Sequence, residues 1–234
     1  MTDPVIRLHL FFARENDRAV ILRQGPSKLF RMILWHRDTD RFEDGQWLKH
    51  KVYVDRCDLS PDGRHFLFVA RDGRWGGMAE GSYTAISRPP YFTALSLFGQ
   101  GDAWGGGGRF FDNAHFQADG GEDQIGRGEG LVRVWQGEPG KGCTTGLRRA
   151  NGQPAAFEKP VRDWLLGRTA RPGRQGNPLD RYDTQGGQLY RRTADGLDLI
   201  RDFRSMRFER IRAPYDWRDP AETGGAPWHP LGSE

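Results

Sequence analysis

Three cations surround a short turn near the start of the chain, where they could hold an anion. Residues 24–28 form the turn, which follows Arg23, precedes Arg31 and contains Ser27 and Lys28. Backbone N–H groups of a tight turn, a hydroxyl and cationic side chains are groups that bind phosphate or carboxylate. We therefore take Arg23, Ser27 and Lys28 as candidate binding residues. The alternative is an ordinary hairpin connection with solvated charges.

A second group of cations lies in residues 141–174, which hold eight basic residues and two acidic ones. Phe157 and Trp164 interleave with these cations, as they would in a protein that stacks on bases and contacts phosphates. Residues 102–129, just before this segment, hold six acidic residues and two arginines, so the charge is segregated. The segment therefore binds nucleic acid, meets an acidic protein surface, or folds back on the chain's own acidic residues 119–129. The candidate contacts are Arg148, Arg149, Arg168 and Arg171.

A third candidate patch joins a cation to aromatic rings. Arg88 is followed by two prolines and then by Tyr91 and Phe92. If the prolines hold Tyr91 exposed beside Arg88, the pair would form a contact of the kind found at binding hot spots. The alternative is that both rings alternate into the core. Trp75 and Trp104 lie in glycine-rich stretches where burial is less automatic, so both are candidates for a partner surface.

Motifs of catalysis and of metal or phosphate binding are absent from the sequence. There is no G-x-S-x-G elbow, no H-x-x-x-H or H-E-x-x-H spacing, and the glycines before Lys141 lack the phosphate-loop spacing. The acidic residues 119–123 lack the ligand order of a calcium loop. Cys57 and Cys143 are far apart and are expected to be reduced, packed thiols. We expect no metal and no cofactor, and a function other than catalysis.

The composition indicates the elements that must position these residues. The chain has 234 residues, a net charge of +4, 12% aromatic residues and, together, 32 glycines and 14 prolines. That content of glycine and proline excludes an all-helical protein and suits many short strands joined by turns. The aromatic content excludes a disordered chain. One β-rich domain over residues 1–217 is expected, with a long irregular excursion at about 99–177 and a loosely ordered tail at 218–234.

Apolar runs bounded by turn residues recur at the spacing of an all-β protein. Asp44 and Gly45 look like one of the turns, and a short helix is expected at 160–166 after its proline. The expected strands are 5–13, 19–22, 29–35, 51–54, 65–70, 83–86, 92–98, 109–111, 131–135, 187–192, 197–202 and 208–213.

Residues 59–70, LSPDGRHFLFVA, resemble the S-P-D-G repeat of bacterial β-propellers of the PD40/WD40-like kind. The resemblance implies that Pro61, Asp62 and Gly63 turn between two strands of one blade, with the following apolar residues packed between blades. Residues 29–40 and 187–200 look like two further strand–turn–strand units. The Gly-His and Trp-Asp signatures of true WD40 blades do not recur at a fixed period. We expect a small propeller-like array of antiparallel sheets with long loops, and the alternative is a β-sandwich.

The first function to expect is therefore a non-catalytic protein-interaction module, a subunit or accessory factor of a bacterial cytoplasmic complex. Loops, tryptophan and arginine are plentiful, which suits a contact surface. The alternatives are a nucleic-acid-binding protein that uses residues 141–174 and, third, a small propeller hydrolase or lyase. No run of about 18 apolar residues suggests a membrane span, and the N-terminus lacks the pattern of a secretory signal, so cytoplasm is the expected location and no membrane partner is expected.

Overall fold

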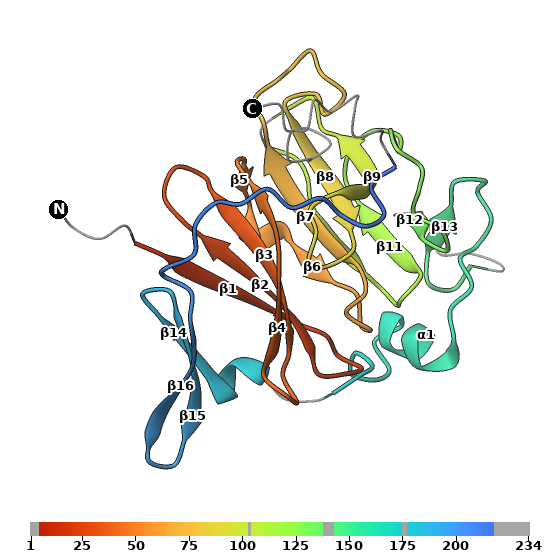
Figure 1. Ribbon diagram of the computed structural model, residues 1–234. Helices are drawn as coiled ribbons and strands as arrows, with labels where there is room; N and C mark the ends of the chain where they lie inside the picture. The colour runs from red at the N-terminus through yellow and green to blue at the C-terminus, as the bar shows by residue number, and fades with distance from the viewer. Residues whose placement is uncertain (1–4, 103, 138–142, 175–176, 218–234) are drawn as a thin grey trace.

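Four β-sheets are stacked face to face in the computed structural model, which describes residues 5–102, 104–137, 143–174 and 177–217 (Figure 1). The all-β class expected from the sequence is confirmed. Pairing is antiparallel except between β11 and β12, and none of the sheets in the described residues closes on itself. The expected loose tail at 218–234 and Lys141 lie outside the described residues.

The first two sheets are built from consecutive strands. The first sheet is β1 (Arg7–Phe12), β2 (Arg18–Gln24), β3 (Phe30–His36) and β4 (Arg41–Leu48). The second sheet is β5 (Lys51–Val52), β6 (Asp58–Leu59), β7 (Phe66–Arg71), β8 (Ser82–Ser87) and β9 (Ala94–Gly99), with the 3-10 helix η1 (Val54–Arg56) between β5 and β6.

The other two sheets lie at the two ends of the stack. The third sheet is β10 (Gly108–Phe110), β11 (His115–Ala118), β12 (Val132–Gln136) and β13 (Leu147–Arg149), followed by α1 (Lys159–Leu165). The fourth sheet is β14 (Tyr182–Gln185), β15 (Gln188–Thr193) and β16 (Gly196–Asp202), preceded by the 3-10 helix η2 (Pro178–Arg181).

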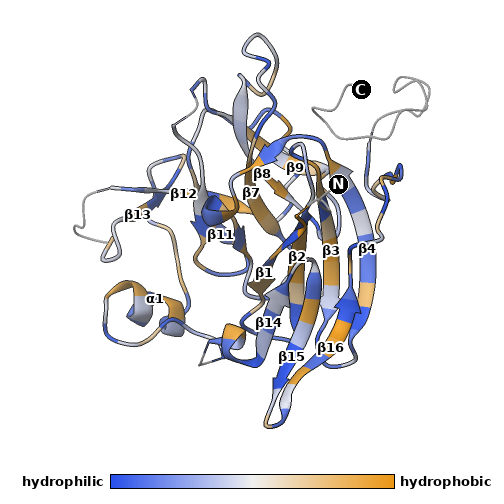
Figure 2. Cartoon of the chain, turned by 90° about the vertical axis from the view of Figure 1, so that its left-hand side faces the viewer, coloured by the Kyte–Doolittle hydropathy of each residue, from blue (hydrophilic) through white to orange (hydrophobic). Residues whose placement is uncertain are grey.

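The apolar runs in the sequence explain why the sheets stack. Successive side chains of a strand point to opposite faces, so Val20 and Leu22 face the second sheet, whereas Ala19 and Ile21 face the fourth. Figure 2 shows β2 and β3 as largely apolar strands between their neighbours. A strand buried on both faces needs a continuous apolar run, which β2 supplies.

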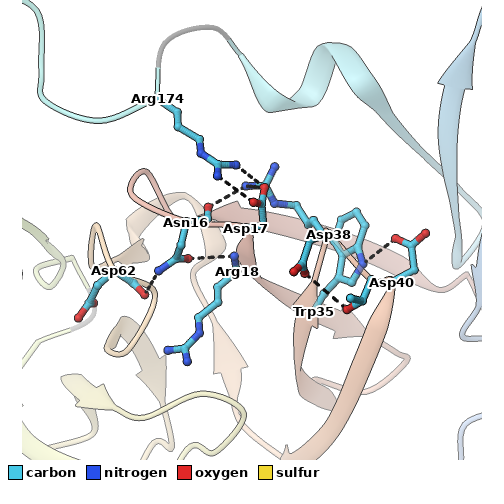
Figure 3. A network of polar contacts seen from close by, with 10 residues as sticks. Asn16, Asp17, Arg18, Trp35, Asp38, Asp40, Asp62 and Arg174 are labelled. Atoms are coloured by element: carbon cyan, nitrogen blue, oxygen red, sulfur yellow. Dashed lines mark hydrogen bonds and ion pairs between the residues drawn. The ribbon is translucent and has the colours of Figure 1, made fainter.

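The turn that carries the family resemblance has the expected geometry. Gly63 has a φ of +70° and its N–H donates to the Ser60 carbonyl over 2.9 Å. The Asn16 amide donates to the Asp62 carbonyl over 2.7 Å, which ties this turn to the turn between β1 and β2 (Figure 3). The polar ends of the first two sheets are therefore joined directly.

Two expectations about local structure are wrong. Asp44 and Gly45 lie inside β4, opposite a shift of register in β3, and do not turn the chain. Gly45 is needed because Pro90 crosses so closely that a β-carbon at position 45 would stand 1.8 Å from the Pro90 carbonyl oxygen. The expected strand at 208–213 is also absent, since residues 203–217 contain no strand and are held by side-chain contacts instead.

The span 99–177 contains more regular structure than expected. The strands expected at 109–111 and 131–135 and the short helix are present, and β11 and β13 are additional. Their apolar residues pack in two clusters. One cluster contains Phe98, Phe110 and Phe116, and the other contains Phe111 and Val134.

Candidate functional site

Three exposed apolar side chains lie on two neighbouring loops at one end of the second sheet. The loop between β7 and β8 (72–81) and the loop between β9 and β10 (100–107) both lie at the top of the view in Figure 1. Trp75 is 48% exposed, Met78 54% and Trp104 88%. Large apolar groups exposed together mark a contact surface more often than singly scattered ones do. We call Trp75, Met78 and Trp104 the aromatic end.

The loop 72–81 is held by its own backbone. The Gly73 N–H donates to the Gly81 carbonyl over 3.0 Å, and the Glu80 N–H donates to the Gly77 carbonyl over 3.0 Å. The Arg71 guanidinium lies 5.5 Å from the ring centre of Trp75. These contacts fix the base of the loop and leave the tip open to a partner.

The loop 100–107 is anchored at the tryptophan itself. One carboxylate oxygen of Asp102 accepts the N–H groups of Trp104 (2.7 Å) and Gly105 (2.6 Å). These two hydrogen bonds, with Gly105 first, lower the pKa of Asp102. The Arg56 guanidinium donates to the Trp104 carbonyl over 2.9 Å and to the Gly105 carbonyl. The backbone at Trp104 is thus held on both sides while its indole faces solvent.

Hydrogen bonds also join the loop 100–107 to Ser82, the first residue of β8. The Gln100 N–H donates to the Ser82 carbonyl over 2.9 Å, and the Ser82 hydroxyl donates to the Asp102 carbonyl. Glu80 lies directly beside Gly99, where a β-carbon would stand 2.9 Å from the carboxylate. The two loops therefore lie side by side at this end of the second sheet.

The turn 24–28 does not present all of the expected cations to solvent, because the arginines on either side of it are buried. Ser27 and Lys28 both have positive φ angles, 57° and 64°. Burial lowers the pKa of His50. The charge of Asp72, in the loop 72–81, raises this pKa, and the charge of Lys28 lowers it. Arg23, in contrast, is buried and donates to the Phe203 carbonyl over 2.8 Å.

Arg31 is also buried and engaged by other parts of the chain. It donates to the Gly45 carbonyl over 3.1 Å and pairs with Glu209. It lies 5.1 Å from the Trp47 ring centre, and Arg23 lies 5.4 Å from the same ring centre. Both arginines thus help to hold residues 203–217 on the first sheet, which local sequence could not reveal.

Arg88 and Tyr91 are partly covered by the chain itself. The Tyr215 hydroxyl accepts from the Arg88 N–H at 3.1 Å, and the Arg88 guanidinium lies 5.5 Å from the Tyr215 ring centre. Tyr91 packs edge-on against the same ring. Phe92 is fully buried, which agrees with the alternative in which this ring packs in the core. This patch is occupied by residues 203–217.

The basic segment is largely engaged within the chain. Arg171 donates to the Phe110 carbonyl over 2.8 Å and lies 3.9 Å from the Asp58 carboxylate. Arg168 pairs with Asp163 at 3.5 Å, and Arg148 donates to the Gly152 carbonyl over 3.0 Å.

The two aromatic residues that the nucleic-acid alternative would use for stacking are half-buried. Phe157 and Trp164 pack on the cluster that contains Phe111 and Val134. Arg149, on β13, has a buried Nε without a hydrogen-bond partner among the described residues. The described part of the segment therefore pairs with Asp163 of its own helix, with Asp58 and, through Arg174, with Asp17.

Within the described ranges, no three His, Cys, Asp or Glu side chains come close enough to hold a metal ion. Cys57 and Cys143 are free thiols, and burial raises the pKa of Cys57 to about 12. A search of the described helices finds none with the length and apolar character needed to cross a membrane.

The sequence singled out Trp75 and Trp104 but missed Met78, whose only signal is its glycine-rich surroundings. Comparisons with protein-family models, with curated proteins and with solved structures return no match to this chain.

Proposed function

We propose that this chain is a non-catalytic interaction module that binds a protein partner through the aromatic end. The observation that carries the proposal is Trp104, an 88% exposed indole on a backbone that Asp102 and Arg56 hold in place. An aromatic side chain on a fixed backbone loses little entropy when it is buried by a partner, and tryptophan is the residue most enriched in hot spots.

The stack of sheets suits this role as a rigid support. Each inner sheet buries apolar side chains on both faces, as blades of a propeller do. We take the stack as an open, propeller-like array whose loops are free to vary without loss of the core. A subunit or accessory factor of a larger complex is the corresponding role.

The nucleic-acid alternative has less support. Phosphate binding needs cations that are free to release counterions on contact. Arg168 and Arg171 face carboxylates of this chain, and Arg174 pairs with Asp17. Half-burial of Phe157 and Trp164 removes the stacking platform that the alternative requires.

Affinity purification from the native cell tests the proposal. A Met78→Ser, Trp104→Ser variant should recover at least about tenfold less of the partner than the wild type, because hot-spot aromatics contribute about 2 kcal/mol or more. Trp75 is left in place because it packs on its own loop.

The matched control is a Leu179→Ser, Leu199→Ser variant. These side chains are 49% and 53% exposed, and they lie on η2 and on β16 of the fourth sheet. The control should recover the partner as the wild type does. Equal recovery by the Met78→Ser, Trp104→Ser variant, or a loss confined to the control, would refute the aromatic end as the partner surface.

A further inference from the structure

A pocket of about 400 Å³ lies between the first sheet and η2, away from the aromatic end. Its walls come from residues 12–14 at the end of β1, from Arg37 just after β3, and from Arg174, Asn177, Pro178, Asp180 and Arg181. That volume is in the range of small-molecule sites.

The lining of this pocket is strongly cationic. It contains four arginines, Arg14, Arg37, Arg174 and Arg181, and one carboxylate, that of Asp180. Arginines placed together repel one another unless an anion lies between them. Within the described ranges, Arg14 and Arg181 have no carboxylate partner in an ion pair. The local excess of positive charge is therefore available to a ligand.

Arg37 is the fixed member of this group. Its side chain is only 7% exposed, and its guanidinium lies 5.2 Å from the Phe12 ring centre. It donates through Nη2 to the Asn16 carbonyl over 3.0 Å. Its Nε is buried and has no hydrogen-bond acceptor among the described residues. A buried donor without an acceptor is costly, so this guanidinium keeps unused hydrogen-bonding capacity next to the pocket.

Asp17 pairs with Arg174, one of the residues that line the pocket, and Figure 3 shows this ion pair. The hydrogen bond from Arg174 lowers the pKa of Asp17 despite its partial burial, and the charges of Arg37 and Arg181 lower it further. The single negative charge of Asp17 thus lies near the positive charges of three arginines. The remaining positive charge favours a second anion on the pocket side.

We propose that this pocket binds the phosphate group of a small phosphorylated molecule. Arginines match the oxygens of a phosphate with paired hydrogen bonds, and a dianion suits four guanidinium groups better than a single carboxylate does. The amide of Asn177 and the carboxylate of Asp180, also in the lining, are suited to hydroxyl groups of the rest of the ligand.

Isothermal titration calorimetry with inorganic phosphate and with glycerol 3-phosphate, at constant ionic strength and neutral pH, tests this site. We expect saturable binding to the full chain, and weakening by at least about tenfold in an Arg181→Gln variant, which loses a charge-assisted hydrogen bond. Arg181 is exposed, so this variant should fold. The control is Arg207→Gln, an exposed arginine outside the pocket lining that should bind like the wild type.

Three results would overturn the proposal. The first is no saturable heat up to about 10 mM of either ligand, since weaker binding is not a specific site. The second is unchanged affinity in Arg181→Gln. The third is tighter, Arg181-dependent binding of succinate or of a single-stranded oligonucleotide, which would assign the pocket to carboxylates or to nucleic acid.

Discussion

The indole of Trp75 lies directly on Gly81, at the other end of the same loop. A β-carbon at position 81 would stand 2.3 Å from the Trp75 ring, and Gly81 has a φ of +82°. We expect Gly81→Ala to lower the free energy of unfolding by about 2 kcal/mol or more, through strain and displacement of the ring. Urea denaturation measures this change.

Gly73→Ala is the matched control for Gly81→Ala. Gly73 has a φ of +78°, but nothing lies within 4 Å of its would-be β-carbon. Gly73→Ala should therefore lower the free energy of unfolding only through the strain of the left-handed backbone, by about 1 kcal/mol. Equal effects of the two substitutions would mean that Trp75 does not pack on Gly81.

Gly63 should be equally intolerant of a side chain. Its φ is +70°, and a β-carbon there would lie 2.9 Å from the Arg18 β-carbon and 3.1 Å from that of Ala13. We expect Gly63→Val to lower the free energy of unfolding by more than Gly152→Val does, because at Gly152 φ is +77° and the space is open. A denaturation midpoint for Gly63→Val at or above that of Gly152→Val would contradict the packing of this turn.

Local signals in the sequence predicted most of the first two sheets. Apolar runs and turn residues are properties of a few neighbouring positions, so β2, β3, β7 and β8 follow from them. The Asp44-Gly45 pair was misleading because a glycine can serve a close approach of backbone as well as a turn. Pro90, which makes that approach, lies 45 positions further along the chain.

The site was predicted only where local context was enough. Trp104 stood out because its neighbours are glycines, which offer no core. The roles of Arg23 and Arg31 depend on Phe203 and Glu209, residues about 180 positions away. No local pattern encodes such pairings. The cationic pocket was missed for the same reason, since Arg37 and Arg181 meet only in the fold.

Stability should fall as the pH drops below neutrality, in part through His50. Burial of the ring lowers the pKa of His50 from its usual value, and its Nδ1 lies 3.2 Å from the Tyr83 hydroxyl oxygen. Between that lowered pKa and about 6.5, the unfolded chain binds a proton that the folded chain does not. The free energy of unfolding should therefore decrease as the pH is lowered through this window.

Urea denaturation between about pH 5 and about pH 7.5 measures the effect, and His50→Gln should reduce the slope. His65, whose pKa burial also lowers, acts in the same direction and should leave part of the slope in that variant. A slope that His50→Gln does not change would show that folding leaves the pKa of His50 unshifted.

Oligonucleotide binding should be weak. At about 0.15 M salt we expect no submicromolar affinity in fluorescence anisotropy, because the segment 141–174 is largely engaged by its own chain. If tight binding is observed and Arg148→Ala with Arg149→Ala abolishes it while the fold is retained, the nucleic-acid alternative is correct. Arg171 should stay unchanged in that test, since its loss would disturb the contact with Asp58.

Photo-crosslinking in the native cell tests the partner surface most directly. A photoreactive phenylalanine analogue at position 104 should give a discrete protein adduct, whereas the same analogue at position 199, also exposed, should not. We predict an adduct at position 104 that is lost when Met78→Ser is added. An adduct at 199 with none at 104 would contradict it.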